Sequence, residues 1–169
     1  MPDTGLLSKI EAAFPGKILE HHSSYGYDVI TLNRDDAFAI FATLRDHPDF
    51  AFSLLSDLTA IDFLGQEPRF ELVYQLYSIS LNHRLQVKIR VPEDAAWAHS
   101  VSSLWKGGNW LEREVWDMFG IKFADHPDLR RILMYEEFNG HPLRKDYPVN
   151  KRQPLVEERD PITNPWPKR

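Results

Sequence analysis

Ionisable side chains are dense in two short stretches of this 169-residue chain, residues 112–131 and residues 140–147. Carboxylates, histidines and arginines that lie close together can ligate a metal ion, transfer protons, or bind the charged groups of another macromolecule. The side chains that could do this chemistry are Glu112, Arg113, Glu114, Asp117, His126, Asp128, Arg130, Arg131, His141, Arg144, Lys145 and Asp146. Their spacing and the elements that carry them decide between these three kinds of chemistry.

The spacing does not favour an active site. His126 begins a His-Pro-Asp sequence, whereas a metal pair on a helix has its two histidines four residues apart. The chain contains neither a glycine-rich phosphate loop nor a Gly-x-Ser-x-Gly nucleophile turn. Asp57 and Asp62 form another pair of carboxylates, and we expect each of them to close a turn by accepting backbone N–H groups. A free-standing metal-dependent hydrolase stays open as an alternative, with His126 and His141 as its candidate ligands.

The same side chains suit the recognition of a partner. The guanidinium groups of Arg130, Arg131 and Arg144 can each bind a carboxylate through two parallel hydrogen bonds. Prolines within these stretches restrict the backbone, which lowers the entropy lost on docking. Two interpretations stay open for the cluster: an internal network of ion pairs that holds this segment on the body of the protein, and direct contact with a partner.

A short helix is predicted at the start of the first stretch. Asn109 can cap its N-terminus, and Glu112, three residues later, completes a capping box. Arg113 precedes Asp117 by four residues, so we expect these two side chains to pair on the helix surface. Gly120 can end the helix in the left-handed conformation. The apolar face of the helix consists of Leu111, Val115 and Met118.

Two strands are the clearest elements upstream of this helix. Apolar and polar residues alternate along 69–78 and along 84–91, which predicts an antiparallel hairpin with a turn near Asn82. Further strands are expected at 17–22, at 26–32 and within 50–64, and further helices at 3–14, 33–47 and 94–106. The predicted fold class is α+β, with a mixed, largely antiparallel sheet of about five strands and helices packed on it.

Composition and charge exclude several classes of protein. The chain has no cysteine, so it can hold neither a cysteine-ligated iron–sulfur cluster nor a disulfide. No apolar run approaches the roughly twenty residues that a membrane-spanning helix needs, and we expect no signal peptide. The polar side of the predicted hairpin is basic at Arg84, Lys88 and Arg90, but the net charge of −5 argues against a nucleic-acid partner.

The last thirty-one residues differ from the rest of the chain. Residues 139–169 contain 7 Lys and Arg against 4 Asp and Glu, whereas the whole chain contains 20 against 25. They also contain six of the twelve prolines, which rules out a long helix or a central strand. We therefore predict a single α+β domain over 1–138 and an extended, basic, proline-rich arm over 139–169. This arm would lie in a groove of a partner or fold back along the acidic body of the chain; disorder is the other interpretation.

Three strings in this part of the chain resemble one known family. They are Glu112-Arg113-Glu114-x-x-Asp117-Met-Phe-Gly-Ile, His126-Pro127-Asp128-Leu129-Arg130-Arg131-Ile-Leu and Gly140-His141-Pro142-Leu143-Arg144-Lys145-Asp146-Tyr147-Pro148. Together with the upstream strings at 58–62 and 69–74, they resemble the 30 kDa (C) subunit family of respiratory complex I, the proton-pumping NADH–quinone oxidoreductase. Trp116 and Ala124 depart from the family, which often has Phe or Tyr at the first position and Gly at the second.

The resemblance implies a non-redox scaffold in the peripheral arm of the complex, on the cytoplasmic side of the inner membrane. Such a scaffold would hold the D subunit, which contains the quinone site, and the iron–sulfur subunits in register for electron transfer from NADH to quinone. FMN, iron–sulfur clusters, NADH and quinone would be bound by other subunits, and the membrane would be reached only through the complex. An equivalent subunit of a membrane-bound hydrogenase or another quinone-linked dehydrogenase would carry the same motif.

The resemblance also implies roles for the motif residues. The helix and its junction would be fixed by Glu112, Arg113, Glu114 and Asp117. The partner contacts would be made by His126, Asp128, Arg130, Arg131, His141, Arg144, Lys145 and Asp146, in a surface that also includes Pro127, Leu129, Gly140, Pro142, Leu143 and Tyr147.

Overall fold

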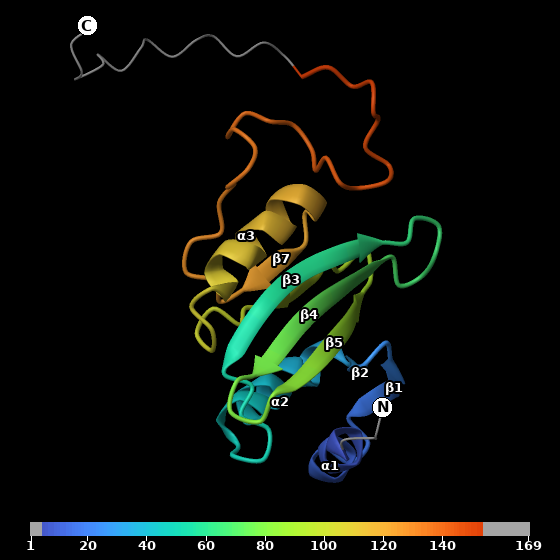
Figure 1. Cartoon of the computed structure of the whole chain (residues 1–169). Coiled ribbons are helices and arrows are strands. Elements are labelled where there is room, and N and C mark those ends of the chain that lie inside the picture. Colours follow the sequence, from blue (N-terminus) through green and yellow to red (C-terminus); the bar gives the residue numbers. More distant parts are fainter. Residues whose placement is uncertain (1–4, 154–169) are drawn as a thin grey trace, which may run out of the picture.

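The computed structural model describes residues 5–153, and five strands within this range form one mixed sheet (Figure 1). The strands are β1 Ile18–Ser24, β2 Tyr27–Leu32, β3 Leu54–Asp62, β4 Phe70–Ser78 and β5 His83–Val91. They lie in the order β1-β2-β5-β4-β3, and only β2 and β5 pair in parallel within this sheet of the described residues. The helices are α1 Leu6–Ala13, α2 Arg34–Asp46 and α3 Gly108–Phe119. The predicted α+β fold with a mixed, largely antiparallel sheet is confirmed.

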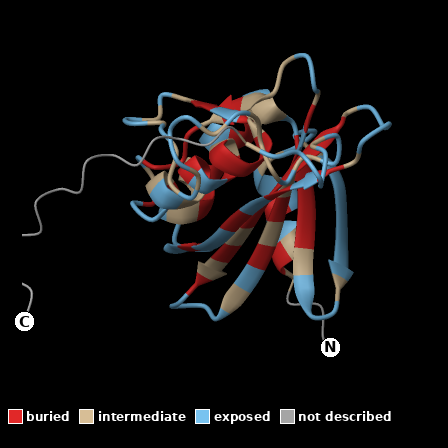
Figure 2. Cartoon of the chain, turned by 90° about the horizontal axis from the view of Figure 1, so that it is seen from above, coloured by how far each residue is buried: buried red, intermediate tan, exposed pale blue. Residues whose placement is uncertain are grey.

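The alternation along β4 and β5 sorts their side chains onto two faces. Phe70, Leu72, Tyr74 and Leu76 of β4 are buried in the core, and Figure 2 shows buried segments together with intermediate or exposed ones along the strands of the sheet. Helix α2 packs on this face, where the rings of Phe41 and Tyr74 lie 4.7 Å apart. The predicted hairpin is confirmed, and its turn contains Asn82 with a positive φ of 53°.

Helix α2 forms where its local signals predict it. Asn33 is its N-cap, and the Asn33 side chain accepts the N–H of Asp35 at 3.5 Å. Ala37, Ile40, Phe41 and Leu44 give the helix one buried face. The helix ends at Asp46, because the Pro48 ring disfavours helical backbone at His47.

The predicted helix over 94–106 was wrong. The chain instead forms the short strand β6, Trp97–His99, which pairs in parallel with β7, Lys122–Ala124. After β6 the chain turns, and the Trp105 indole N–H donates to the carbonyl of Phe52 at 3.1 Å. The spacing of Trp97, Val101 and Trp105 fits a helix equally well, so pairing with a distant strand overrode the local pattern.

The described part of the predicted arm lies against the domain. In Figure 1 the orange and red segment runs from the end of β7 past α3 toward the β3–β4 loop. Gln153 donates to the carbonyl of Asn139 at 3.0 Å, which closes residues 139–153 into a loop. The boundary at residue 139 stays a prediction, and residues 154–169 of the arm lie outside the described residues. None of the helices within 5–153 has the length and apolar character needed to cross a membrane.

Candidate functional site

Helix α3 carries the first charged stretch, but it does not begin as predicted. Gly107 is its N-cap, a residue without a side chain that could cap the helix. The predicted capping box of Asn109 and Glu112 was wrong, because the Glu112 carboxylate points into the protein. Gly120 ends the helix with a φ of 79°, as predicted. A Cβ at this position would lie 2.7 Å from the His141 ring, so Gly120 also permits this close contact.

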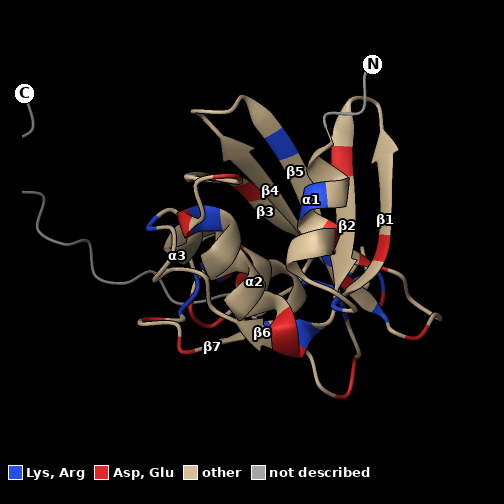
Figure 3. Cartoon of the chain, turned by 90° about the horizontal axis from the view of Figure 1, so that it is seen from below, with Lys and Arg blue, Asp and Glu red and all other residues tan. Residues whose placement is uncertain are grey.

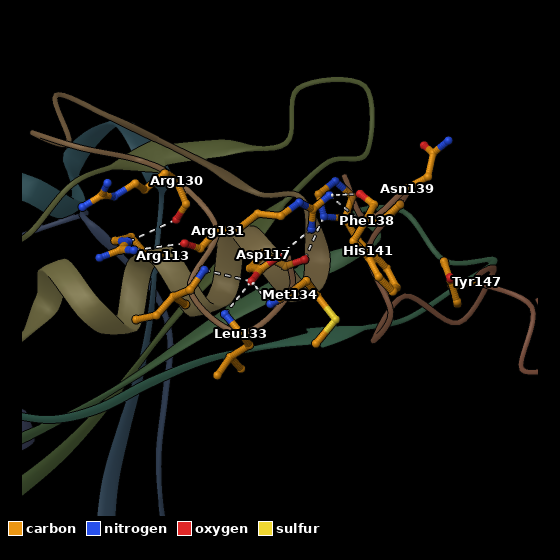
Figure 4. A network of polar contacts seen from close by, with 12 residues as sticks. Arg113, Asp117, Arg130, Arg131, Leu133, Met134, Phe138, Asn139, His141 and Tyr147 are labelled. Carbon is orange, nitrogen blue, oxygen red and sulfur yellow. Dashed lines mark hydrogen bonds and ion pairs between the residues drawn. The ribbon is translucent and has the colours of Figure 1, made fainter. Parts of the chain in front are cut away.

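The Asp117 carboxylate, fully buried on α3, holds the loop that follows β7 (Figure 4). Its Oδ2 accepts three consecutive backbone N–H groups, those of Ile132, Leu133 and Met134, at 3.0, 2.8 and 2.9 Å. Its Oδ1 accepts from the Arg131 guanidinium at 2.5 Å. Burial alone would raise the pKa of Asp117, but these donors outweigh it and hold the pKa below its ordinary value.

Two arginines complete this anchor, and Arg113 does not form its predicted pair with Asp117. Arg113 donates from Nε and Nη2 to the carbonyls of Arg130 and Arg131, at 3.1 and 3.0 Å, instead of pairing with Asp117. Besides binding Asp117, Arg131 donates to the carbonyls of Phe138 and Gly140, at 2.8 and 3.1 Å. The two guanidinium groups therefore hold the backbone of residues 130–140 on α3 (Figure 4).

The second charged stretch is attached to the C-terminal end of α3. His141 Nδ1 lies 3.0 Å from the carbonyl oxygen of Asp117, and the N–H of Leu143 donates to the carbonyl of Met118 at 3.1 Å. The His141 ring also stands edge-on to Trp116, with their centroids 6.4 Å apart. Residues 141–143 thus satisfy carbonyl groups that the end of a helix leaves without partners.

A buried arginine fastens the rest of this stretch to the sheet. Arg69, only 3 % exposed, donates from Nε and Nη2 to both oxygens of Asp62, at 2.9 and 2.8 Å. Its Nη1 also lies 2.6 Å from Glu93 and 3.1 Å from Asp146. Arg144 contacts the same Glu93 at 2.8 Å. Hydrogen bonds from Arg69 lower the pKa values of Asp62 and Asp146, which keeps both carboxyls ionised.

The prediction that Asp57 and Asp62 each close a turn was wrong, because both residues lie within β3. Asp57 accepts the N–H of its neighbour Leu58 at 2.9 Å. Asp62 accepts one backbone N–H, but it comes from Lys145, 83 residues away, at 2.8 Å. The principal partner of Asp62 is the Arg69 guanidinium, so this carboxylate belongs to an ion-pair network and does not close a turn.

Glu112 is a buried acid next to a buried histidine. Its Oε1 accepts the N–H of Val101 and its Oε2 accepts the hydroxyl of Ser100, both at 2.6 Å. His126 Nε2 lies 3.8 Å from Oε2, and neither side chain is exposed. Because His126 Nδ1 accepts the N–H of Asp128 at 3.0 Å, the proton of the neutral ring is on Nε2, which donates to the Asn109 carbonyl at 3.1 Å.

The position of Glu112 predicts an unusual pH dependence. Burial raises its pKa from 4.5 to about 7, against the hydrogen bonds from Ser100 and Val101 that favour the ionised form. Because the folded-state value is the higher one, its stabilising contribution is full below about pH 4.5. That contribution falls as the pH rises through 7, by about 3 kcal/mol in total.

We expect Glu112→Gln to abolish this component of the pH dependence. The Gln amide can donate to Ser100 and accept from Val101 without a charge. Urea unfolding of both proteins between pH 5 and 8 gives the difference in their free energies of unfolding at each pH. The free energy of unfolding of the variant should increase relative to that of the unmodified chain as the pH rises. A difference that does not change with pH would contradict the raised pKa of Glu112.

The structure divides the predicted site residues into two groups. The groups bound within the protein are Glu112, Arg113, Asp117, His126, Arg131, His141, Arg144 and Asp146, with Leu129, Gly140, Pro142 and Tyr147 partly buried around them. The remaining members are exposed, as is Asp146 of the first group; they are Glu114, Pro127, Asp128, Arg130, Leu143 and Lys145. The internal-network interpretation therefore accounts for most of the charges, and the two histidines bind backbone groups. No cluster of three metal-ligating side chains occurs within residues 5–153.

Four apolar side chains in the same region are exposed. Trp110, Leu133, Tyr135 and Leu143 are between 43 and 57 % exposed. Leu143 belongs to the predicted contact surface, whereas Trp110, Leu133 and Tyr135 are not among the predicted site residues, because a large apolar side chain more often lies in the core. Glu93 was also missed, and no sequence signal marks it as a partner of Arg69 and Arg144.

Comparison with known proteins finds one family. A family model described as the 30 kDa subunit of respiratory-chain NADH dehydrogenase matches residues 30–153. The C subunit of NADH-quinone oxidoreductase from Geobacter metallireducens is 46 % identical over 142 residues, which cover 83 % of this chain and 86 % of that protein. The C 2 subunit of the same enzyme from Rhizobium etli is 42 % identical over 147 residues, covering 85 % and 78 %.

Two solved structures are also similar. The trypsin-resistant fragment (1-134) of Nqo5 superposes with a TM-score of 0.63 at 30 % identity and covers 73 % of this chain and 96 % of that one. A chain of the membrane-bound sulfane sulfur reductase, an archaeal respiratory membrane complex, gives a TM-score of 0.72 at 23 % identity and covers 92 % and 95 %. The second likeness concerns the fold alone.

Proposed function

Because this chain belongs to the family of the 30 kDa subunit of respiratory-chain NADH dehydrogenase, we propose that it is the C subunit of a proton-pumping NADH–quinone oxidoreductase. In this role it is a non-redox scaffold of the peripheral arm on the cytoplasmic side of the inner membrane. It holds the quinone-site subunit and the iron–sulfur subunits in register, while FMN, the clusters, NADH and quinone are bound by those other subunits. The family match over 30–153 carries this proposal and favours an NADH-linked complex over the hydrogenase alternative.

The arrangement of charges supports a scaffold. Residues 130–146 are held against α3 and the sheet by hydrogen bonds of Asp117, Arg131 and Arg69. This irregular segment therefore has a defined shape without a partner. A contact surface that is ordered before docking loses less entropy on binding. The charged network thus prepares the contact surface, and other side chains make the contacts.

Exposed apolar side chains are the best candidates for those contacts. The interaction surface, as defined here, consists of Trp110, Leu133, Tyr135 and Leu143 with the exposed cations Arg130 and Lys145. Figure 4 shows the Leu133 side chain pointing away from Asp117, while its backbone N–H points toward the carboxylate. Large apolar and aromatic side chains of this kind carry most of the binding energy in protein interfaces.

We expect Leu133→Asp to prevent assembly of the complex without unfolding the chain. An interface leucine replaced by a charge costs about 2 kcal/mol or more of binding, so recovery of the tagged chain with its partners should fall at least about tenfold. The free energy of unfolding should change by less than about 0.5 kcal/mol, because Leu133 is 56 % exposed. Co-purification from gently solubilised membranes and urea unfolding of the isolated chain measure these two effects.

Leu19→Asp is the matched control, since Leu19 is 61 % exposed but lies on β1, away from the interaction surface. It should assemble like the unmodified chain. Equal assembly of the two variants would show that the interaction surface is wrongly placed.

A further inference from the structure

Three basic side chains on the polar face of β5 have unequal surroundings. Lys88 Nζ lies 3.2 Å from a Glu71 oxygen, and Arg90 Nη2 lies 3.3 Å from Glu20. Among residues 5–153, Arg84 has no carboxylate within ion-pair distance, and its Nη1 donates to the neutral Tyr27 hydroxyl at 3.0 Å. Arg84 is therefore the cation of this row whose charge the described part of the chain does not balance.

Arg84 is held in place by aromatic rings. Its guanidinium carbon lies 5.7 Å from the centroid of the Tyr27 ring and 5.5 Å from that of Tyr77. The Tyr77 hydroxyl in turn donates to Asn82 Oδ1 at 2.8 Å, which links Tyr77 to the β4–β5 turn. We call Arg84 with Tyr27 and Tyr77 the arginine clamp. A guanidinium oriented in this way keeps its remaining N–H donors in a fixed fork, the geometry that a carboxylate accepts.

The arginine clamp borders a hollow on this face of the sheet. The hollow has a volume of about 390 Å³ and is lined by polar residues of neighbouring strands, among them Gln75, Gln86 and Asp57. Arg84 pairs with Tyr77 across β5 and β4, whereas Asp57 pairs with Gln75 on the far side of β4. The hollow thus has a cationic side and an anionic side, so a bound carboxylate must lie at the Arg84 side.

Exposed apolar side chains surround the same end of the sheet. Figure 3 shows the β1–β2 turn and the β4–β5 turn at one end, to which the register of the parallel pair β2–β5 also brings them. Tyr25 in the first turn is fully exposed, and Ile79 in the second is 64 % exposed. Arg69 precedes the first residue of β4 and Ile79 follows its last, so this end is remote from the ion pairs that hold residues 144–146.

We propose that this end of the sheet is a second docking surface, which binds a protein segment of another subunit. One carboxylate side chain of this segment binds Arg84, and its apolar side chains contact Ile79 and Tyr25. The inference rests on the proposed scaffold function, because the segment would belong to a neighbouring subunit of the complex. Arginine and tyrosine are enriched at the centres of protein interfaces. A scaffold with docking surfaces at opposite ends of its sheet can fix the distance between two neighbours.

Photo-cross-linking in the assembled complex tests this surface. The photo-cross-linker p-benzoylphenylalanine replaces Ile79 in one chain and Leu133 in another, and each chain is irradiated in gently solubilised native membranes. We expect both positions to form adducts with other subunits. The adduct from position 79 should map to a segment with an Asp or Glu near the cross-linked residue. Arg84→Glu should reduce that adduct about tenfold and leave the adduct from position 133 unchanged.

The controls separate the two proposals. Arg84→Lys should keep part of the adduct from position 79, because the charge stays while the fork is lost, and Asp57→Asn should not reduce it. An adduct from position 133 with none from position 79, or with a lipid or a second copy at position 79, would overturn the second docking surface alone. Insensitivity of the adduct to Arg84→Glu would do the same. The absence of adducts at both positions would overturn the scaffold function as well.

Discussion

Arg69→Met is expected to lower the free energy of unfolding by about 3–5 kcal/mol, because it leaves a buried carboxylate without its counter-charge. The Asp62 side chain is 1 % exposed and receives two hydrogen bonds from Arg69. After the substitution its ionised form keeps only the backbone N–H of Lys145. Asp146 also loses its bond to Arg69, so residues 144–146 would be held on the domain only by the bonds of Lys145 to Asp62 and of Arg144 to Glu93. Urea unfolding at pH 7 measures the effect.

The acid dependence of unfolding gives a second measure of the same network. The pKa values of Asp62 and Asp146 lie below their ordinary values, so their stabilising contribution is full above about pH 4 and is lost as the pH falls through the lowered values. Arg69→Met should remove most of this acid-labile contribution. The matched control is Arg90→Met, because the Arg90 side chain is 48 % exposed and should contribute less than about 1 kcal/mol. Equal losses from the two variants would contradict the network.

Asp117→Asn is expected to release the loop at residues 130–134. An amide has one acceptor oxygen where the carboxylate has two, so its NH₂ group would face another donor, either the N–H groups of the loop or the Arg131 guanidinium. The N–H groups of Ile132, Leu133 and Met134 would lose their charged acceptor, at a cost of about 3 kcal/mol. Native-state hydrogen exchange at these three amides should accelerate about a hundredfold. Assembly of the complex should also fail in Asp117→Asn, because Leu133 would no longer be held in position.

Glu114→Gln is the control for this prediction, because Glu114 lies on the same helix and is exposed. It should leave hydrogen exchange at the three amides unchanged. If the three amides exchange at the same rate in Asp117→Asn as in the unmodified chain, the carboxylate does not hold the loop.

The elements with strong local signals could be predicted from the sequence. Alternation along β4 and β5 decides which face of each strand is buried, whatever the rest of the chain does. Asn33 and Gly120 mark helix ends because each satisfies a backbone requirement within a few residues. Residues 94–106 could not be predicted in this way, because β6 depends on β7, which follows about twenty-five residues later.

The roles of the charged residues could not be assigned because their partners are distant in the chain. Arg69 and Asp146 are 77 residues apart, and Asp117 binds N–H groups 15 to 17 residues further on. Spacing of three or four residues suggested helix pairs instead, which is why Arg113 was matched with Asp117 and Glu112 with Asn109. The exposure of Trp110 and Leu133 could not be predicted either, because apolar type alone indicates a core residue.

The central claim is that this chain is a scaffold within an electron-transfer complex. Purification of the tagged full chain from gently solubilised native membranes, with the accompanying proteins identified by mass spectrometry, tests this most directly. We predict that the chain brings down the flavin-bearing, iron–sulfur and quinone-site subunits in equal amounts, together with NADH-dependent quinone reduction. Recovery of the full chain alone, from membranes that retain this activity, would contradict the claim.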